Sequence, residues 1–356
     1  MKKLLKTLLA LLLVIILAAG GYVIYVLSAY YRIEDNLTLS VSGEGAAELC
    51  ENTPYRIATY NVGFGAYSAD YSFFMDGGVY SRAYSADAAK ENILTAAAAA
   101  ANLDADIYLF QEVDTKGTRS YDVNQFDLLT EALPETFANV FAQNYDSPYL
   151  FYPFHSPIGA NVSGIATYSA FPITSAVRRS LPVESGFMKL LDLDRCYSIS
   201  RIPCEGGKEL VIFNVHLSAY TSDGSIADTQ LEMLFEDMTA EYENGNYVIA
   251  GGDFNKDLLG DSSSYFGIKL EEEAPWAQGF PEDMLPDGFM LVKPLGEDAP
   301  VPSCRLADSP YTENSFVLTV DGFIVSKNIT VSGSAVSDVG FACSDHNPVY
   351  LDFILR

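Results

Sequence analysis

The segment Gly251-Gly252-Asp253-Phe254-Asn255 places a carboxylate and an amide two residues apart, directly after a strand-like run. That run, residues 247–250, is apolar and partly β-branched, which is typical of a buried strand. In an extended segment the side chains at i and i+2 point the same way, so Asp253 and Asn255 can face one site. A carboxylate can orient a water and an amide can hydrogen-bond a developing oxyanion, so the pair suits phosphate chemistry.

Five further strand-like segments each border on a polar residue of a type that performs catalysis or binds metal. They are 56–60 before Asn61, 107–110 before Gln111 and Glu112, 210–215 before His216, 316–320 before Asp321, and 349–355 after Asp345 and His346. Open α/β sheets carry their chemistry at strand ends. Six such coincidences in one chain predict that these residues share a site.

These segments together resemble the endonuclease/exonuclease/phosphatase superfamily, which includes pancreatic-type deoxyribonucleases, apurinic-site endonucleases, neutral sphingomyelinases and inositol-polyphosphate 5-phosphatases. The resemblance covers roughly residues 55–356, and GGDFN and SDHNPV are its most specific parts. The matching pieces, in the family's order, are TYN (59–61), QEVD (111–114), a strand ending in Phe-Pro-Ile (164–173), NVHL (214–217), GGDFN (251–255), VDGFIVS (320–326) and SDHNPV (344–349).

The resemblance implies an α/β fold: a four-layer sandwich of two packed mixed β-sheets flanked by helices, with the site at the carboxyl ends of the inner strands. It also implies a role for each matching residue. Asn61 and Glu112 would hold Mg²⁺, with Mn²⁺ as an alternative, and Asp345 would be a second metal ligand or hold a water. The implied catalytic residues are Asp253, which aligns or deprotonates the nucleophile, Asn255, which contacts the phosphate, the pair Asp321–His346, and His216, which stabilises or protonates the transition state.

For some of these residues, the side-chain chemistry also allows an ordinary structural role. Asn61 could cap a turn, and Glu112 could be a solvated loop carboxylate. Some nucleases of the family carry an acidic residue two positions after the first Asn, where this chain has Gly63, which argues against an apurinic-endonuclease-like activity. In the aromatic, Gly-rich segment 70–84, Arg82 could contact a phosphate or be solvated. We interpret segment 259–315 as a surface insertion or lid.

The amino-acid composition argues against binding of long nucleic acid. The chain has 356 residues, with 47 acidic and 21 basic residues and a net charge of −26. Duplex binding needs a basic face, yet the densest basic feature is the pair Arg178-Arg179. A small phosphoester or a lipid head group therefore fits better as substrate. We expect a monomer, although the sequence leaves the oligomeric state open.

The N-terminal sequence predicts a membrane anchor. Lys2, Lys3 and Lys6 precede an uncharged run, residues 7–31, that is long enough to span a bilayer. Basic residues favour the cytoplasmic side, so the body would lie outside the cytoplasm, on a single-pass cell-membrane protein. The alternative is a signal peptide cleaved after Ala18-Ala19-Gly20, which would release a secreted protein. The predicted organisation is an anchor (1–31), a juxtamembrane tether (32–54) and a catalytic domain (55–356).

Two further local sequence patterns concern a helix and the cysteines. Residues 86–102 predict a helix that begins at an N-cap, Ser85, and joins two parallel strands. The five cysteines are too few and too scattered for a disulfide framework, and a Cys196–Cys204 pair and free thiols both remain open. The sequence thus predicts an extracytoplasmic, metal-dependent phosphoester hydrolase, a phosphodiesterase or a phosphatase. The alternatives are a secreted or tethered nuclease and a catalytically silent metal- or phosphate-binding module.

Overall fold

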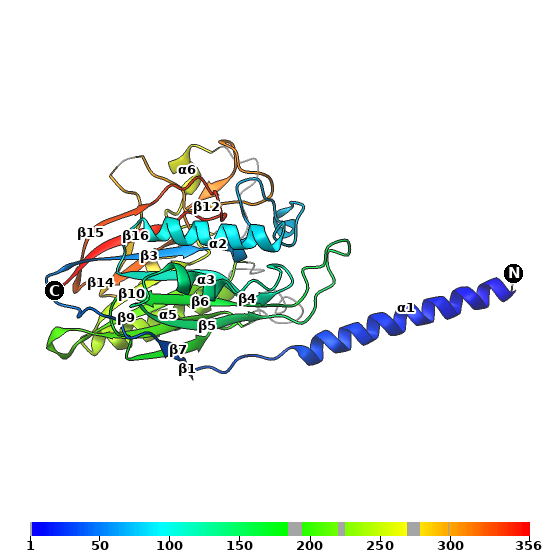
Figure 1. Ribbon diagram of the computed structural model, residues 1–356, viewed down its shortest axis with the longest axis horizontal. Helices are drawn as coiled ribbons and strands as arrows, with labels where there is room; N and C mark the ends of the chain where they lie inside the picture. The colour runs from blue at the N-terminus through cyan, green and yellow to red at the C-terminus, as the bar shows by residue number, and fades with distance from the viewer. Residues whose placement is uncertain (1, 184–193, 220–224, 269–277, 298) are drawn as a thin grey trace.

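Two β-sheets packed face to face make up the body of the protein in the computed structural model, which describes residues 2–183, 194–219, 225–268, 278–297 and 299–356 (Figure 1). In the described part, each sheet has seven strands. The first sheet runs in the order β1 (Leu37–Thr38), β7 (Ser175–Ser180), β8 (Cys196–Pro203), β9 (Glu209–His216), β10 (Tyr247–Asp253), β14 (Asp321–Ser326) and β11 (Phe289–Val292). The second runs β15 (Ile329–Val336), β16 (Val349–Leu355), β3 (Pro54–Asn61), β4 (Ile107–Gly117), β6 (Asn161–Ser169), β5 (Ala138–Asp146) and β2 (Val41–Ser42).

Both sheets are mixed, as predicted. In each, one central pair is parallel, β9 with β10 and β3 with β4, and the neighbouring pairs are antiparallel. The main core lies between the sheets, where Ile57 and Leu109 of the second sheet pack with Ile212 and Ile249 of the first. This core is apolar on both inner faces, which is why the central strands read as nearly continuous hydrophobic runs.

Helices cover the outer faces and complete the four layers. On the second sheet lie α2 (Ala86–Ala101) and α3 (Gln125–Ala132), and α5 (Ser225–Glu243) lies on the first. The predicted helix is confirmed as α2: Ser85 caps it by accepting a hydrogen bond from the amide of Ala88 at 3.1 Å. Shorter elements are α6 (Ser262–Phe266), the hairpin of β12 (Cys304–Arg305) and β13 (Val317–Leu318), and the 3₁₀ turns η1 (Gly63–Gly65), η2 (Phe74–Asp76), η3 (Glu205–Gly207) and η4 (Glu282–Met284).

Two strand predictions need correction. The strand associated with Asp321 was predicted to end before it, at residue 320, but β14 begins at Asp321 and runs onward to Ser326. The strand predicted to end before Gln111 continues as β4 to Gly117 and is interrupted by a β-bulge between Phe110 and Val113. Asp321 therefore opens a strand of its own, whereas Gln111 and Glu112 lie inside a strand that is longer than predicted.

The predicted tether packs on the body. β1 and β2 add an edge strand to each sheet, and Leu49 is fully buried in the main core. The anchor region forms one helix, α1 (Lys2–Ala29), which projects away from the body (Figure 1). It is long and apolar enough to be a candidate transmembrane span, and a signal sequence would pass the same test.

All five cysteines are free thiols. Cys196 begins β8 and Cys204 follows its end, so the extended strand holds the two apart. The disulfide that the sequence left open is therefore not formed. Within segment 259–315, β11 joins the first sheet and Arg305 is buried, so part of the predicted insertion is integral to the fold. Trp276 lies outside the described residues.

Candidate active site

Strand direction gathers the predicted residues at one edge of both sheets. Asn61, His216 and Asp253 end β3, β9 and β10, so they lie at carboxyl ends. Asp321 begins β14, which is antiparallel to β10, and pairs directly with Asp253. His346 likewise precedes β16, which is antiparallel to β3. The predicted location at carboxyl ends thus holds for three residues, while Asp321, Asp345 and His346 reach the same edge from amino ends.

A β-bulge aims Glu112 into the site. Glu112 has a φ of 56°, in the left-handed region that non-glycine residues rarely adopt. Bulges re-aim side chains, and strained backbone of this kind concentrates at functional sites. The Glu112 carboxylate lies 3.4 Å from the amide nitrogen of Asn61. The side chain is 26% exposed and lines the pocket, so it is neither deeply buried nor a free surface group.

Asp253 is the hub of the buried polar groups. Its carboxylate accepts hydrogen bonds from Asn61 Nδ2 and from the amide of Asn255, both at 2.9 Å. The Nε2 atoms of His216 and His346 lie 3.7 and 3.8 Å from its Oδ2. Burial, followed by the charge of Asp321, raises the pKa of Asp253 to about 6. A carboxylate with that pKa can take up and release a proton near neutral pH.

Asp321 and His346 form the predicted pair. His346 Nδ1 donates to Asp321 Oδ2 at 2.8 Å, and Ser303 Oγ donates to the same oxygen at 2.7 Å. Burial alone would lower the pKa of His346, but the Asp321 carboxylate outweighs it and raises that pKa well above its usual value. His346 is therefore charged at neutral pH. The thiol of Cys304 lies 3.6 Å from Nε2.

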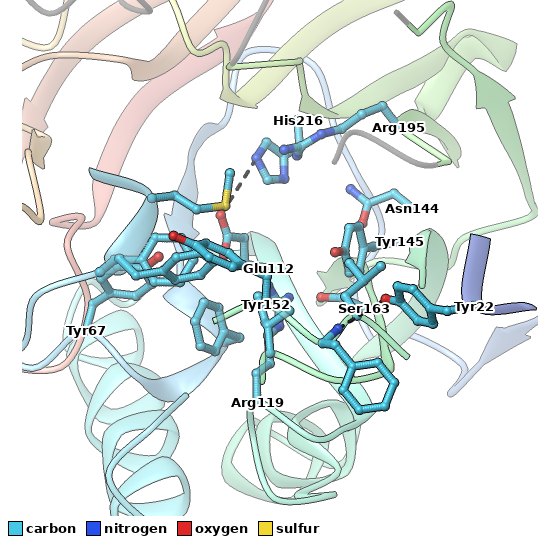
Figure 2. Close-up of a pocket in the computed structure, with 17 residues that line it drawn as sticks. Tyr22, Tyr67, Glu112, Arg119, Asn144, Tyr145, Tyr152, Ser163, Arg195 and His216 are labelled. Atoms are coloured by element: carbon cyan, nitrogen blue, oxygen red, sulfur yellow. Dashed lines mark hydrogen bonds and ion pairs between the residues drawn. The ribbon is translucent and has the colours of Figure 1, made fainter. Parts of the chain in front are cut away.

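His216 has the opposite electrostatic character. Its side chain is buried, and this burial lowers its pKa well below the usual value. Its Nε2 lies 4.0 Å from the Glu112 carboxylate, a contact drawn as a dashed line in Figure 2. A neutral imidazole at this position can donate a hydrogen bond to a phosphoryl oxygen, but it carries no spare proton. Of the two predicted roles, stabilisation of the transition state suits it better than protonation.

Two clusters offer ligands for a metal ion. In the described residues, ligand atoms of Asp253, Asp321 and His346 all lie within 4.8 Å of one another. His346 would have to release its proton to coordinate a cation, so this cluster suits proton handling better. Near Gly63, burial raises the pKa of Asp345 to about 7; the charge of His346 opposes this rise and that of Glu112 adds to it. Burial and the charge of Glu112 both make the ionised form of Asp345 unfavourable, and a divalent cation beside the two carboxylates would stabilise it.

A cleft of about 570 Å³ leads away from Glu112 and His216 (Figure 2). Phe64, Tyr67 and Phe73 form an aromatic wall on the side of η1 and η2. Two arginines that the sequence analysis missed also line it: Arg119, and Arg195 beside His216. Arg119 donates hydrogen bonds to both carboxylate oxygens of Asp114, at 2.7 and 3.1 Å. Asp114 is the last residue of the QEVD motif, so the motif contains the acidic partner from which a nearby arginine could have been predicted.

Ser303 was also missed, because no pattern around it separates it from an ordinary loop serine. Arg82 lies outside the lining of the cleft and its Nε donates to the carbonyl of Pro157 at 2.6 Å. Its phosphate-binding role stays a prediction. Asn255 Nδ2 donates to the carbonyl of Leu217 at 2.8 Å, which fixes the amide beside Asp253.

Comparison with known proteins assigns the family. The model of the endonuclease/exonuclease/phosphatase family matches residues 58–346, which cover most of the chain. The chain belongs to this family. Its members are phosphoester hydrolases that typically depend on divalent metals, so the buried Asp/Asp/His cluster lies in a hydrolase scaffold. No curated protein matches the sequence.

Solved structures of the family share the fold. One from Beutenbergia cavernae is 16% identical with a TM-score of 0.55 and covers 85% of this chain and 72% of its own. One from Bacteroides thetaiotaomicron is 18% identical with a TM-score of 0.55 and covers 85% and 96%. Truncated Caenorhabditis elegans TDP2 is 14% identical with a TM-score of 0.50 and covers 85% and 98%. At these identities the likeness establishes the fold.

Proposed function

We propose that this protein is a divalent-metal-dependent phosphoester hydrolase whose catalytic body lies outside the cytoplasm. The observation that carries the proposal is the setting of Asp253. Its carboxylate lies 2.9 Å from Asn61 and 3.7 and 3.8 Å from two imidazoles, one neutral and one charged. A base, a cation and a neutral hydrogen-bond donor thus face one point, which is what attack of water on a phosphoester requires.

The charge states support a division of labour. Asp253, with a pKa of about 6, orients the attacking water and takes its proton. The imidazolium of His346, held by Asp321, stabilises the negative charge that develops at phosphorus. Neutral His216 donates a hydrogen bond to a phosphoryl oxygen, and Asn255 contacts the phosphate from the same side as Asp253. In this scheme His346 is not the base, because its pKa keeps it protonated.

Asn61, Glu112 and Asp345 are the residues that would hold the metal ion. Their donor atoms are oxygens, which Mg²⁺ and Mn²⁺ prefer. When bound, the cation neutralises charge on the phosphoryl oxygens. The raised pKa of Asp345 supports this assignment, because burial and the nearby charge of Glu112 both make its ionised form unfavourable without a counter-charge.

A small phosphoester or a lipid head group is the favoured substrate. The cleft is largely aromatic and apolar, with Arg119 and Arg195 as its cations. The basic pair Arg178-Arg179 does not form a nucleic-acid patch: Arg178 is fully buried and Arg179 is paired with Asp35 and Asp237. Together with the net charge of −26, this disfavours long polyanions.

The test is metal-dependent hydrolysis by the full-length protein in detergent micelles, with bis-p-nitrophenyl phosphate and p-nitrophenyl phosphate as substrates. We expect nitrophenol release with Mg²⁺, none with EDTA, and a loss of several orders of magnitude in Asp253→Ala. Turnover of the diester establishes a phosphodiesterase, and turnover of the monoester alone a phosphatase. If folded protein turned over neither substrate, the catalytically silent binding module would be the better account.

The nuclease alternative has its own assay. Supercoiled plasmid is incubated with the protein and Mg²⁺, and nicking that disappears in Asp253→Ala would favour a nuclease. We expect no nicking, because the net charge of −26 disfavours binding of duplex DNA.

A further inference from the structure

The loop between β5 and β6 is uncharged in an otherwise acidic protein. Residues 147–160, Ser-Pro-Tyr-Leu-Phe-Tyr-Pro-Phe-His-Ser-Pro-Ile-Gly-Ala, contain no Asp, Glu, Lys or Arg, although the chain has a net charge of −26. Phe154 is 84% exposed, Tyr152 63% and Phe151 50%. Several large apolar side chains exposed side by side mark an interaction surface.

This loop is fastened to the end of α1. The hydroxyl of Tyr22 accepts a hydrogen bond from the amide of Phe151 at 3.2 Å and donates to the carbonyl of Tyr149 at 3.1 Å. Tyr25 accepts from the amide of Tyr149 at 3.1 Å. The rings of Tyr22 and Phe151 also meet edge to face, with centroids 5.1 Å apart. The loop and the last turns of the helix therefore form one unit.

The position of Tyr22 along α1 fixes the depth of this unit in a membrane. The uncharged stretch from Thr7 to Tyr25 rises ~27 Å at ~1.5 Å per residue, close to the ~30 Å hydrocarbon thickness of a bilayer. Tyr25 then falls at the interface between hydrocarbon and water, and Tyr22 lies about one turn deeper, at the hydrocarbon edge of the zone where tyrosine is enriched. The loop that hydrogen-bonds to them lies at the same level.

We propose that Tyr22 and Tyr25 of α1, together with Phe151, Tyr152 and Phe154 of the loop, form a membrane-contact surface that rests in the head-group region of the bilayer. The partner is the lipid surface itself. The proposal rests on the placement of α1 in the membrane, which is part of the proposed function. Since the loop carries no carboxylate, the acidic body approaches an anionic surface through a segment that is not repelled.

The contact surface also orients the active site. Tyr22, Phe151 and Tyr152 line the same cleft as Glu112 and His216. Figure 2 shows Tyr22 on the side of this cleft away from Glu112. The ring of Tyr152 meets that of Phe74, with centroids 5.7 Å apart, and Phe74 in turn contacts Phe73 of the aromatic wall. With the contact surface at the bilayer, the mouth of the cleft faces lipid, and a phosphoester anchored by an apolar group can enter it directly.

The test uses single-tryptophan variants of the full-length protein in liposomes that contain brominated phosphatidylcholine. The background is Trp276→Phe, which removes the one native tryptophan. Phe154→Trp reports on the loop and Leu12→Trp on the middle of α1. Tyr265→Trp is the matched control: Tyr265 is 47% exposed on α6, which lies away from α1 in Figure 1.

We expect bromolipid to quench Phe154→Trp and Leu12→Trp at least about twofold, and to leave Tyr265→Trp unquenched, since Trp at the interface is within reach of the acyl bromines. Quenching of Leu12→Trp but not of Phe154→Trp would contradict the membrane-contact surface and still support α1 as the anchor. Absence of quenching in both variants would also contradict the placement of α1 in the membrane. A blue-shifted Phe154→Trp emission without quenching would mean that a second copy of the protein covers the loop, which also overturns the proposal.

Discussion

At the scale of single residues, burial and neighbouring charge decide what each acid and base can do. Of two histidines at the same edge of the sheets, one is charged and the other neutral, because His346 has Asp321 beside it and His216 has no carboxylate within hydrogen-bonding distance among the described residues. Asp253, between them, keeps a pKa of about 6. Two predictions test these assignments.

Replacement of Asp321 removes the group that keeps His346 charged. In Asp321→Asn, burial is no longer opposed and the pKa of His346 falls. We expect kcat to drop by ~10²- to 10⁴-fold with a smaller change in KM. The drop should be greater at pH 8 than at pH 6, where the weakened base still binds its proton. The pH profile of kcat measures this, and Asp283→Asn, an exposed aspartate, is the control. An unchanged kcat at pH 8 would contradict the role of the charge.

Replacement of Asp345 tests the cation site by stability. Burial raises its pKa from 3.8 to about 7, so without metal its ionisation destabilises the folded state progressively between about pH 4 and pH 7 and fully above that. In EDTA at pH 8, Asp345→Asn should therefore increase the free energy of unfolding by about 1–2 kcal/mol, and the gain should shrink at pH 5.

Mg²⁺ should reduce that difference in stability. At tenfold excess over Kd, the wild-type protein should gain about 1.4 kcal/mol by mass action, while Asp345→Asn gains less. Urea denaturation with and without Mg²⁺ measures both effects. If Asp345→Asn were less stable than wild type in EDTA at pH 8, the ionised Asp345 carboxylate would not be unfavourable in the folded state.

At the scale of elements, small residues let backbones approach closely where the site is built. The buried face of α2 is mostly alanine, with Ala96, Ala97 and Ala100 packed on the second sheet. Gly252 in β10 has a φ of +145°, and a Cβ there would lie 2.0 Å from the carbonyl oxygen of Val215 in β9. The alanines bring a helix close to the sheet and the glycine brings two strand ends together, and each feature supports a prediction.

An enlarged side chain in the helix–sheet contact should cause overpacking. Ala97→Leu should lower the free energy of unfolding by about 1–3 kcal/mol, because the packed sheet leaves no room for three more carbons. Ala98→Leu, one residue further and exposed, is the matched control and should change stability by no more than about 0.5 kcal/mol. Equal effects of the two substitutions, measured by urea denaturation, would contradict close packing of α2.

Replacement of Gly252 should displace Asp253. A methyl group at this position cannot coexist with the Val215 carbonyl, so β10 must shift away from β9. We expect Gly252→Ala to lose at least about 2 kcal/mol of stability and most of the activity of the folded fraction. Gly279→Ala is the control, since its added carbon meets nothing closer than 3.5 Å. Wild-type turnover in Gly252→Ala would show that the strand end tolerates movement.

At the scale of the whole molecule, charge and the apolar helix decide where the protein can work. We expect an acidic body with a net charge of −26 to disfavour polyanions. In the described residues, α1 offers one apolar stretch long enough to span a membrane. The basic residues Lys2, Lys3 and Lys6 precede this stretch, so a retained helix is predicted to orient the body away from the cytoplasm.

Protease accessibility tests this orientation. When the full-length protein is expressed in a bacterial host, we expect it to remain in the membrane fraction after carbonate extraction. Proteinase K added to intact spheroplasts should degrade the body, because it lies outside. A body protected until the spheroplasts are lysed would reverse the orientation, and a shortened protein in the medium would establish cleavage and secretion.

The sequence by itself determined the strand-like runs, the capped helix and the motifs, because these are local signals. Apolar runs of strand length predicted the strands, and motifs at strand borders singled out residues such as Asp253 and His346. The sandwich followed from the resemblance of these motifs to a known family. Net charge and the N-terminal apolar run likewise need no three-dimensional information.

Only the tertiary structure decided what depends on distant segments. The pairing of Asp321 with Asp253 follows from the antiparallel register of β14, and the aim of Glu112 from a bulge against β6. No sequence pattern marks Ser303, whose partner Asp321 lies 18 residues away, or Arg195, which only the fold brings to the cleft. The different charge states of the two histidines arise from burial and neighbours, which no linear spacing encodes.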